Sequence, residues 1–126
     1  MYKRFENNPC GKSIGDCAVR AISVALDIDW YEAFDLLTRE ARRMCDMPSA
    51  DAVWGSVLRR NGFSRFAMPN SCPNCYSAAD FCYDHPVGTY VLAFGGHVAT
   101  IRNGVLLDSW DSSQEIPQYY WYRKDE

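Results

Sequence analysis

The pattern of hydrophobic and polar positions in the first half of the chain predicts helices. Between residues 16 and 26, apolar side chains recur at Ala18, Ala21, Ile22 and Ala25. These positions follow the i, i+3, i+4, i+7 spacing that places side chains on one face of a helix. Because most of this stripe is alanine, we expect the helix to pack closely against a sheet or another helix.

Two more helices are predicted before residue 62. Asp29 followed by Glu32 forms a capping-box pattern, which opens a helix over residues 30–44. A third helix over residues 50–60 ends at Asn61-Gly62, a pair typical of helix termination. In the second of these helices, the side chains expected to face inward are Phe34, Leu37 and Ala41.

The second half of the chain changes character and is rich in β-branched and aromatic residues. Asn103-Gly104 is the strongest short-range signal for a two-residue hairpin turn. The predicted strands are residues 63–68, 89–94, 97–102, 105–110 and 119–123, with one or two helical turns over residues 77–84. The sequence therefore predicts a single α+β domain over residues 1–126, whose N-terminal helices (about 1–62) pack on a C-terminal antiparallel β-sheet (about 63–126).

Composition narrows the function classes. The chain has 126 residues, of which 48% are hydrophobic and 23% charged, and a net charge of −3, so neither wholesale disorder nor a strongly basic nucleic-acid-binding surface is expected. We find no apolar run of the roughly 20 residues that a membrane span requires. The start lacks the apolar segment of a secretory signal, and we therefore expect a cytoplasmic protein with reduced thiols. Its six cysteines then suggest catalysis, metal binding or simple burial.

Cys17 and His97 are the first candidates for chemistry. Cys17 begins the first predicted helix, where unpaired backbone N–H groups and the positive end of the helix dipole favour a thiolate. His97 follows Gly95-Gly96 and opens a predicted strand. Each residue has a simpler interpretation, because Cys17 could be a small packing residue and His97 a half-buried histidine hydrogen-bonded within the sheet.

The predicted hairpin selects an aspartate to accompany His97. If Asn103-Gly104 forms the turn, Arg102 faces Val105 and Ala99 faces Asp108. His97 and Asp108 then lie on one face as diagonal neighbours, within reach of each other. Asp111 falls on the opposite face in this register, and a slip of one residue would reverse the choice. Cys17, His97 and Asp108 would together supply a nucleophile, a base and a group that orients the base.

Three segments carry a resemblance to a known family. Gly15-Asp16-Cys17 opening a helix, Gly96-His97-Val98 opening a strand, and Leu107–Asp111 after a hairpin resemble papain-like cysteine peptidases. The likeness is greatest to small bacterial and phage-encoded members that are similar to bacteriocin-leader-processing peptidases, and it extends from about residue 7 to residue 122. It implies a papain-like fold, a peptide or protein substrate, and no cofactor for catalysis.

The resemblance also implies roles for the site residues. Cys17 would attack a carbonyl, His97 would protonate the leaving group, Asp108 would hold the imidazole, and the Cys17 N–H would form part of the oxyanion hole. Papain-like enzymes usually place a glutamine six residues before the cysteine, where this chain has Gly11, so Lys12, Ser13 or Asn8 is the candidate second donor. The alternative function is an inactive papain-like module that binds a peptide.

The sequence also gives predictions for residues outside the triad. Asp16 would raise the pKa of the adjacent thiol, unless it caps the helix and pairs with Arg20. Trp110 is expected to shield His97 from water. Residues 119–122 are aromatic on both faces, as expected of a strand that is covered on both sides. Cys45 is expected in the core, and Cys10 either lines the site or has no role.

A second cluster has the spacing of a metal site. Cys72 and Cys75 form a C-x-x-C pair, and Cys82 and His85 form a C-x-x-H pair six residues later. Four such ligands within a short segment are a plausible tetrahedral set for a structural zinc ion. The competing interpretation is that these side chains are buried or free, with Cys82 and His85 facing the core from a helical turn.

Overall fold

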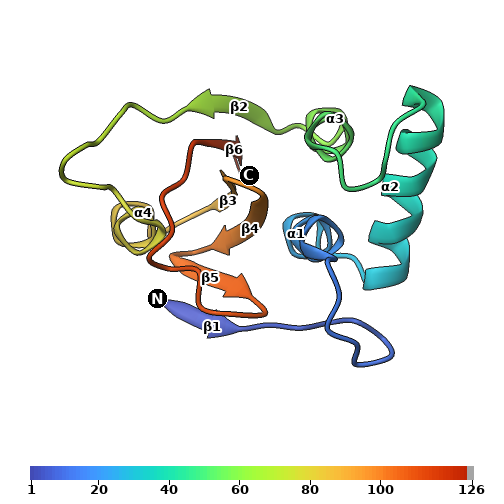
Figure 1. The fold of residues 1–126 in the computed structure, drawn as a ribbon, viewed down its shortest axis with the longest axis horizontal. Coiled ribbons are helices and arrows are strands. Elements are labelled where there is room, and N and C mark those ends of the chain that lie inside the picture. Colours follow the sequence, from blue (N-terminus) through green and yellow to red (C-terminus); the bar gives the residue numbers. More distant parts are fainter. Residues whose placement is uncertain (125–126) are drawn as a thin grey trace.

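The computed structural model describes residues 1–124, in which four helices pack on both faces of a six-stranded sheet (Figure 1). The elements are β1 (Tyr2–Arg4), α1 (Cys17–Leu26), α2 (Trp30–Met44), α3 (Asp51–Arg60), β2 (Ser64–Ala67), α4 (Ala78–Asp84), β3 (Thr89–Phe94), β4 (His97–Arg102), β5 (Val105–Asp108) and β6 (Tyr119–Arg123). The predicted α+β class is confirmed, and each helix and strand expected from the sequence is present.

The sheet is mixed rather than wholly antiparallel. Its strand order is β1-β5-β4-β3-β6-β2, and β1 runs parallel to β5 while the other pairs are antiparallel. Sequence patterns missed β1 because three residues are too few to show a two-residue hydrophobic period. Its exposed Lys3 and Arg4 suit a strand at the edge of a sheet, where charged side chains discourage pairing with another chain.

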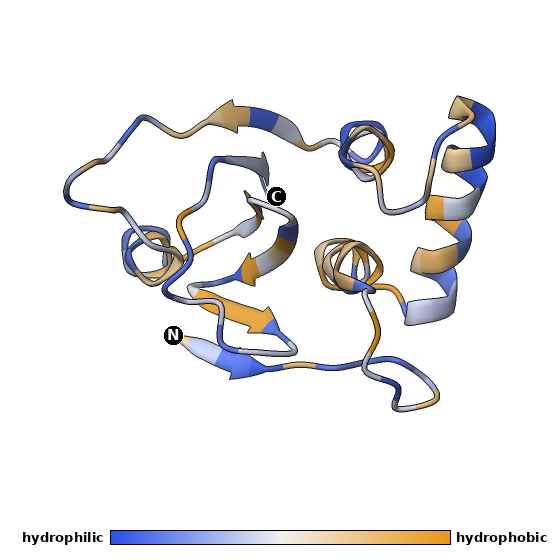
Figure 2. Ribbon diagram, in the orientation of Figure 1, coloured by the Kyte–Doolittle hydropathy of each residue, from blue (hydrophilic) through white to orange (hydrophobic). Residues whose placement is uncertain are grey.

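Helix α1 lies between the sheet and α2, as its narrow alanine stripe predicted (Figure 1). Ala18, Ala21, Ile22 and Ala25 are all buried. They share one core cluster with apolar side chains of α2, α3 and the sheet, while α4 covers a second cluster on the other side of the sheet. Figure 2 shows α1 coloured mainly as hydrophobic, whereas α2, which has a solvent-facing side, is divided between hydrophilic and hydrophobic residues.

Helix α2 begins where the sequence predicted, with a different inward face. The Asp29 side chain accepts a hydrogen bond from the Glu32 backbone N–H at 2.8 Å, which satisfies an unpaired donor of the first turn. Leu37 and Ala41 are buried, but the expectation for Phe34 was wrong, since its side chain is 41% exposed. Phe34 stacks on Trp30 instead, with ring centroids 5.1 Å apart, and Ala33 takes the buried position.

Cys45 does not lie in the core as expected. It is exposed and ends α2 in a left-handed conformation, with φ of 55°. Its backbone N–H bonds to carbonyls of the last helical turn, which is the role that a residue at this position of a helix serves. Backbone geometry, rather than apolar character, therefore decides where Cys45 lies.

The turn at Asn103-Gly104 sets the register of β4 and β5. Both residues have positive φ, 50° and 76°, as a type I′ hairpin turn requires. The predicted pairing of Arg102 with Val105 is confirmed. Strand β5 ends at Asp108, two residues earlier than predicted, where the Asp108 side chain accepts a hydrogen bond from the Ser109 backbone N–H at 2.8 Å and turns the chain away from the sheet.

Within residues 1–124, none of the helices has the length and apolar character needed to cross a membrane.

Leu37 and Phe34 provide a paired test of how α2 packs. Leu37→Ala removes a fully buried side chain and should lower the free energy of unfolding by about 2–5 kcal/mol. Phe34→Ala should cost less than half as much, since Phe34 is partly solvated. Urea denaturation of the two variants measures the difference. An equal loss in both would contradict the inward face described here.

Candidate active site

The structure brings Cys17, His97 and Asp108 together from three different elements. His97 Nε2 lies 2.7 Å from Asp108 Oδ2, and the Cys17 thiol is hydrogen-bonded to the His97 side chain. Since Nε2 faces the carboxylate, Nδ1 is the ring nitrogen left for the thiol. Asp111, the second choice from the hairpin register, is exposed, and its side chain accepts a hydrogen bond from the Ser113 backbone.

Cys17 is the first residue of α1, as expected, and the start of this helix has no side-chain cap. Asp16 occupies the capping position without accepting a hydrogen bond from the first turn. Backbone N–H groups at the start of a helix have no partner within the helix. Those at Cys17 and Ala18 are thus donors beside the sulfur, and the Val98 backbone also hydrogen-bonds the thiol.

Asp108 is fully buried and has a partner at each carboxylate oxygen. Besides His97, Oδ2 accepts a hydrogen bond from the Ser112 hydroxyl at 2.6 Å. Oδ1 accepts hydrogen bonds from the Arg20 guanidinium at 3.1 Å and from the Ser109 backbone at 2.8 Å. A buried carboxylate with this many donors stays ionised and holds its orientation. Asp108 can therefore fix the plane of the His97 ring.

Arg20 connects Asp108 to the beginning of α1. Its side chain is 5% exposed and donates to Asp16 Oδ1 at 2.9 Å, so the predicted pairing of Asp16 with Arg20 is confirmed. Glu6 adds a longer ion pair, at 3.6 Å. The Trp30 indole N–H donates to Asp16 Oδ2 at 3.0 Å. The predicted capping role for Asp16 was wrong because both of its oxygens are used by these side chains.

The hydrogen bonds polarise Cys17 and His97 toward an ion pair. Burial raises the pKa of the Cys17 thiol, but its hydrogen bonds to His97 and the Val98 backbone, with the nearby positive charge of Arg20, outweigh burial and hold that pKa below its usual value. Burial lowers the pKa of His97, yet Asp108 and Cys17 together raise it to about 9. Both shifts favour a thiolate paired with an imidazolium over a neutral thiol beside a neutral imidazole.

Burial and hydrogen bonding also have opposite effects on the pKa of Asp108. Burial raises it, but the hydrogen bonds from His97 and Ser112 hold it below the usual value. The carboxylate is therefore ionised whenever the ion pair is formed.

Aromatic rings enclose the imidazole. The Trp110 ring lies 4.9 Å from His97 between centroids, as predicted, and Phe94 stacks on it at 5.9 Å. His97 keeps only 12% of its side chain exposed, whereas Trp110 is 46% exposed. Trp110 is therefore the outer cover of the site, and a low-polarity surrounding strengthens the hydrogen bond between His97 and Asp108.

The candidates for a second oxyanion donor lie in the segment before α1. Lys12 and Ser13 are exposed, and the Asn8 side-chain oxygen accepts hydrogen bonds from the backbones of Cys10 and Lys12. Asn8 thereby orders a tight turn around Gly11, whose φ is 64°. Cys10 is exposed in this turn. An oxyanion role for Lys12, Ser13 or Asn8 stays a prediction.

The four candidate zinc ligands occupy different environments. Cys72 and Cys75 are exposed in the segment before α4, while Cys82 is buried in the second core cluster. His85 stacks on Phe81 with ring centroids 3.8 Å apart. Within residues 1–124, no three or more His, Cys, Asp or Glu side chains are grouped so as to hold a metal ion. A structural zinc site stays a prediction.

Sequence reasoning missed Ser112 and Trp30 and gave Arg20 only part of its role. Ser112 lies four residues after Asp108 in a segment without regular structure, and Trp30 reaches Asp16 from the start of α2. Arg20 could have been noticed as a charged residue on an otherwise apolar helix. A buried arginine needs buried carboxylates, and this is the signal that could have linked Asp16 to Asp108.

We predict that iodoacetamide labels Cys17 selectively at about pH 6, where roughly one ordinary thiol in several hundred is ionised. Because the Cys17 pKa is lowered, its thiolate is lost only when the pH falls through that lowered value. The stabilising charge on His97 is fully present below its ordinary pKa and is lost as the pH rises through about 9. Mass spectrometry of labelled peptides over a range of pH measures the acid limb, which is the fall in the Cys17 labelling rate as the pH decreases.

In the same experiment, His97→Ala should move the acid limb for Cys17 to higher pH by removing the strongest stabilising partner of the thiolate. The exposed Cys10 serves as the reference thiol in both proteins. Equal labelling rates for Cys17 and Cys10 at about pH 6 would rule out the ion pair.

Arg20 can be tested through both stability and thiol ionisation. Arg20→Met leaves Asp16 and Asp108 buried without their shared cation and should destabilise the fold by about 3–5 kcal/mol. It should also move the acid limb of Cys17 labelling to higher pH, and Arg20→Lys should restore part of that shift by retaining the charge. Arg43→Met removes an arginine that is mostly exposed and should cost much less. An unmoved acid limb in Arg20→Met would show that Arg20 does not act on the thiol.

No protein-family model matches the chain, and neither a curated protein nor a solved structure matches it significantly. The function must therefore be inferred from the geometry of the site.

Proposed function

We propose that the protein is a papain-like cysteine hydrolase that cleaves a peptide or amide bond with the triad Cys17, His97 and Asp108. The observation that carries this proposal is the continuous chain of contacts from the thiol through His97 to a fully buried carboxylate. A histidine that only packs in a sheet would need neither a thiol on one nitrogen nor an ionised carboxylate on the other.

The fold supports the proposal because the nucleophile begins a helix that packs against the strand carrying the histidine. Helix α1 contacts β4, and β4 pairs with β5, which ends at Asp108. This order of nucleophile, base and orienting residue, on a helix followed by two adjacent strands, is the arrangement that the resemblance to papain-like peptidases implies.

The first half of the reaction acylates Cys17. The thiolate attacks the carbonyl carbon, a C–S bond forms, and the carbonyl electron pair moves to oxygen. Backbone N–H groups of the first turn of α1 supply hydrogen bonds to this oxyanion. When the intermediate collapses, the C–N bond breaks and the His97 imidazolium gives its proton to the departing amine. A thioester on Cys17 and a neutral His97 remain.

The second half releases the acyl group. Neutral His97 takes a proton from a water molecule as the water attacks the thioester carbon. Collapse of this intermediate breaks the C–S bond, releases a carboxylic acid and restores the thiolate beside the imidazolium. Asp108 holds the ring in place throughout and stabilises its charged form. An amine in place of water would make the same step an acyl transfer.

A cavity of about 250 Å³ lies beside the nucleophile. Asp16 and Ala18, the residues on either side of Cys17 in the chain, both line it. Its apolar walls come from α1, α2 and the segments before α1 and after α2. These side chains are Ile14, Ala18, Val19, Trp30, Phe34 and Pro48. We propose that the cavity accepts an apolar side chain of a peptide substrate, next to the bond that is cleaved.

The proposed chemistry uses only groups of the protein itself and water, and therefore needs no cofactor. All six cysteines are free thiols. We propose a cytoplasmic location, because a reducing compartment keeps a catalytic thiol active.

One observation favours the alternative, a papain-like module that binds peptides without cleaving them. Gly11 stands where papain-like enzymes carry the glutamine of the oxyanion hole, and a glycine has no side-chain donor to offer. In that case the ion pair would persist and the cavity would bind peptide, but no acyl-enzyme would form.

Turnover of a mixed peptide library, followed by mass spectrometry, distinguishes the two functions. We expect cleavage that falls about a thousandfold or more in Cys17→Ala and in His97→Ala, because the triad acts as a unit. The rate should also decline as the pH rises through about 9, where His97 loses the proton that it must donate. Cys10→Ser is the control and should retain the full rate. Peptide binding with selective Cys17 labelling but no cleavage would establish the alternative.

A further inference from the structure

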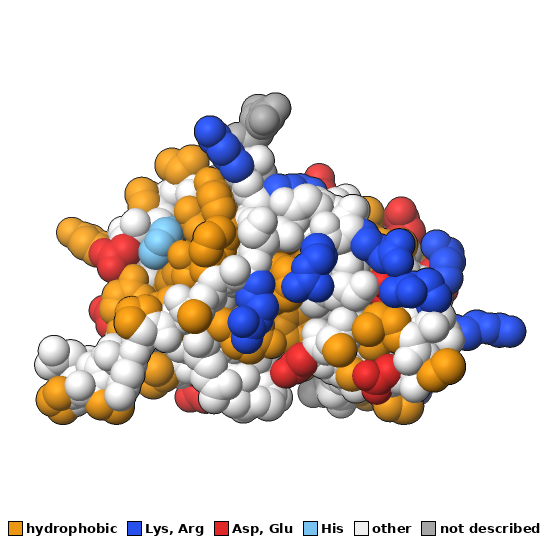
Figure 3. Space-filling view, turned by 90° about the horizontal axis from the view of Figure 1, so that it is seen from above, with side chains coloured by type: hydrophobic (Ala, Val, Ile, Leu, Met, Phe, Trp, Pro, Cys, Tyr) orange, Lys and Arg blue, Asp and Glu red, His pale blue; other side chains and the backbone are white. Residues whose placement is uncertain are grey.

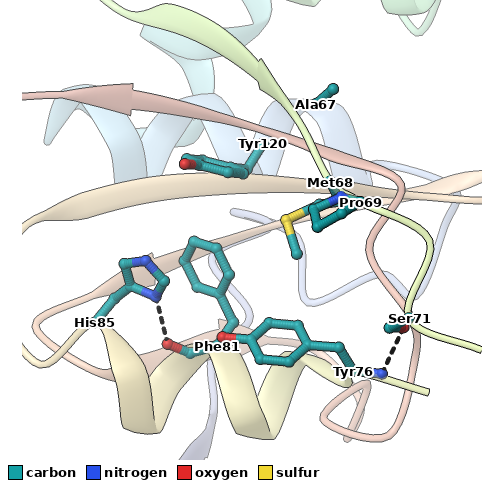
Figure 4. Close-up of a pocket in the computed structure, with 8 residues that line it drawn as sticks. All are labelled: Ala67, Met68, Pro69, Ser71, Tyr76, Phe81, His85 and Tyr120. Atoms are coloured by element: carbon teal, nitrogen blue, oxygen red, sulfur yellow. Dashed lines mark hydrogen bonds between the residues drawn. The ribbon is translucent and has the colours of Figure 1, made fainter. Parts of the chain in front are cut away.

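A second cavity lies away from the triad, between α4 and the adjoining strands β2 and β6. Its volume is about 300 Å³, and no residue of the triad lines it (Figure 4). Ala67, Met68 and Pro69 line one side, where the chain leaves β2. The remaining lining residues come from the segment before α4, from α4 and its C-terminal cap, and from β6, and they are Ser71, Tyr76, Phe81, His85 and Tyr120.

The walls of this cavity are built for a flat ring. Phe81 stacks on His85 with an interplanar angle of 16°, and its ring meets Tyr120 edge to face with centroids 5.1 Å apart. Figure 4 shows Met68 and Pro69 across the cavity from Phe81. Aromatic faces, ring edges and a methionine sulfur all make favourable contacts with another aromatic ring.

His85 adds one directional polar group. Its Nδ1 lies 2.9 Å from the Phe81 carbonyl oxygen. A carbonyl can only accept, so Nδ1 carries the proton, and in the neutral ring Nε2 presents a lone pair. Figure 4 shows this second nitrogen on the edge of the ring turned toward Tyr120. The neighbouring Tyr76 hydroxyl donates to Asp84 at 2.6 Å, so its proton is already used.

The surroundings leave the cavity accessible. Phe66 is 43% exposed and stacks on Tyr120, extending the aromatic wall outward. In Figure 3, hydrophobic side chains gather around a histidine over the α4 end of this face, while Lys and Arg side chains gather over the α2 and α3 end. A charged ligand would find no opposite charge among the lining residues, which include no Asp, Glu, Lys or Arg.

We propose that this cavity binds a single flat aromatic ring system bearing an N–H or O–H donor, such as an indole or a phenol, with His85 Nε2 as the acceptor. A volume of about 300 Å³ lies at the small end of ligand pockets, which suits one bicyclic ring. The ring belongs either to a free small molecule or to a tryptophan or tyrosine side chain of a peptide. The proposal does not depend on catalysis by Cys17.

Titration of isotope-labelled protein with indole, followed by backbone amide NMR shifts, tests the proposal. Indole should cause saturable shifts in the segments that line the cavity, which are residues 67–71, 76–85 and 118–120. N-methylindole has nearly the same shape but lacks the donor, and should bind about three- to tenfold more weakly. Shifts confined to other parts of the chain, no saturable shifts, or equal binding of the two probes would overturn the proposal.

Two variants separate the acceptor from the cavity. His85→Phe keeps a flat ring against Phe81 but removes the acceptor, and should bind the two probes equally. Met68→Trp puts a bulky ring where Figure 4 shows the Met68 side chain lining the cavity, and should abolish binding of both probes. Met47→Trp, at an exposed position outside this cavity, is the matched control and should bind as the parent does. Unchanged indole binding in Met68→Trp would also overturn the proposal.

A tryptophan-containing tripeptide distinguishes the two sources of the ring. Tighter binding of the tripeptide than of indole would assign the cavity to a polypeptide partner, and tighter binding of indole would assign it to a free small molecule. Both outcomes support the cavity as a site for an aromatic ring that bears a hydrogen-bond donor. Cys17→Ala should lose turnover and still bind indole as the parent does, because Cys17 lies outside the cavity.

Discussion

The buried carboxylate of Asp108 is the constraint on which the rest of the structure depends. An ionised group without solvent exposure is strongly destabilising unless donors surround it. Its donors are His97 on β4, Arg20 on α1, and Ser109 and Ser112 in the segment that follows β5. Satisfying this one side chain therefore fixes the helix, the hairpin and the loop relative to one another, and the proposed catalytic geometry is a consequence of that requirement.

Arg20 extends the same constraint to the second helix. It is shared between Asp108 and Asp16, and Asp16 in turn accepts a hydrogen bond from Trp30 at the beginning of α2. The network takes the place of the usual side-chain cap of α1, so the N–H groups of its first turn donate to no capping side chain. Stability and chemistry thus draw on the same buried charges, and Arg20 contributes to the lowered pKa of Cys17 from within that network.

The two faces of the sheet serve different purposes in our proposals. One face packs against α1 and belongs to the core cluster that holds the nucleophile in place. The other is covered by the short helix α4, where Phe81 and the capping residue His85 leave an aromatic cavity beside Tyr120. The segment between β2 and α4 therefore lies over a cavity with the chemistry of a binding site, and its cysteines Cys72 and Cys75 are exposed beside it.

Much of this protein could be predicted from short-range sequence patterns. The alanine stripe indicated the close packing of α1, although residues 18–25 are buried on all its sides, and Asn103-Gly104 determined a hairpin register that brings His97 to Asp108 rather than Asp111. Only the tertiary structure decided the parallel pairing of β1, the exposure of Phe34, and the convergence of Arg20 and Ser112 on one carboxylate. The physical reason is sequence separation. A turn or a helical stripe is set by residues a few positions apart, whereas the partners of a buried charge are chosen by packing between segments as distant as residues 20 and 108.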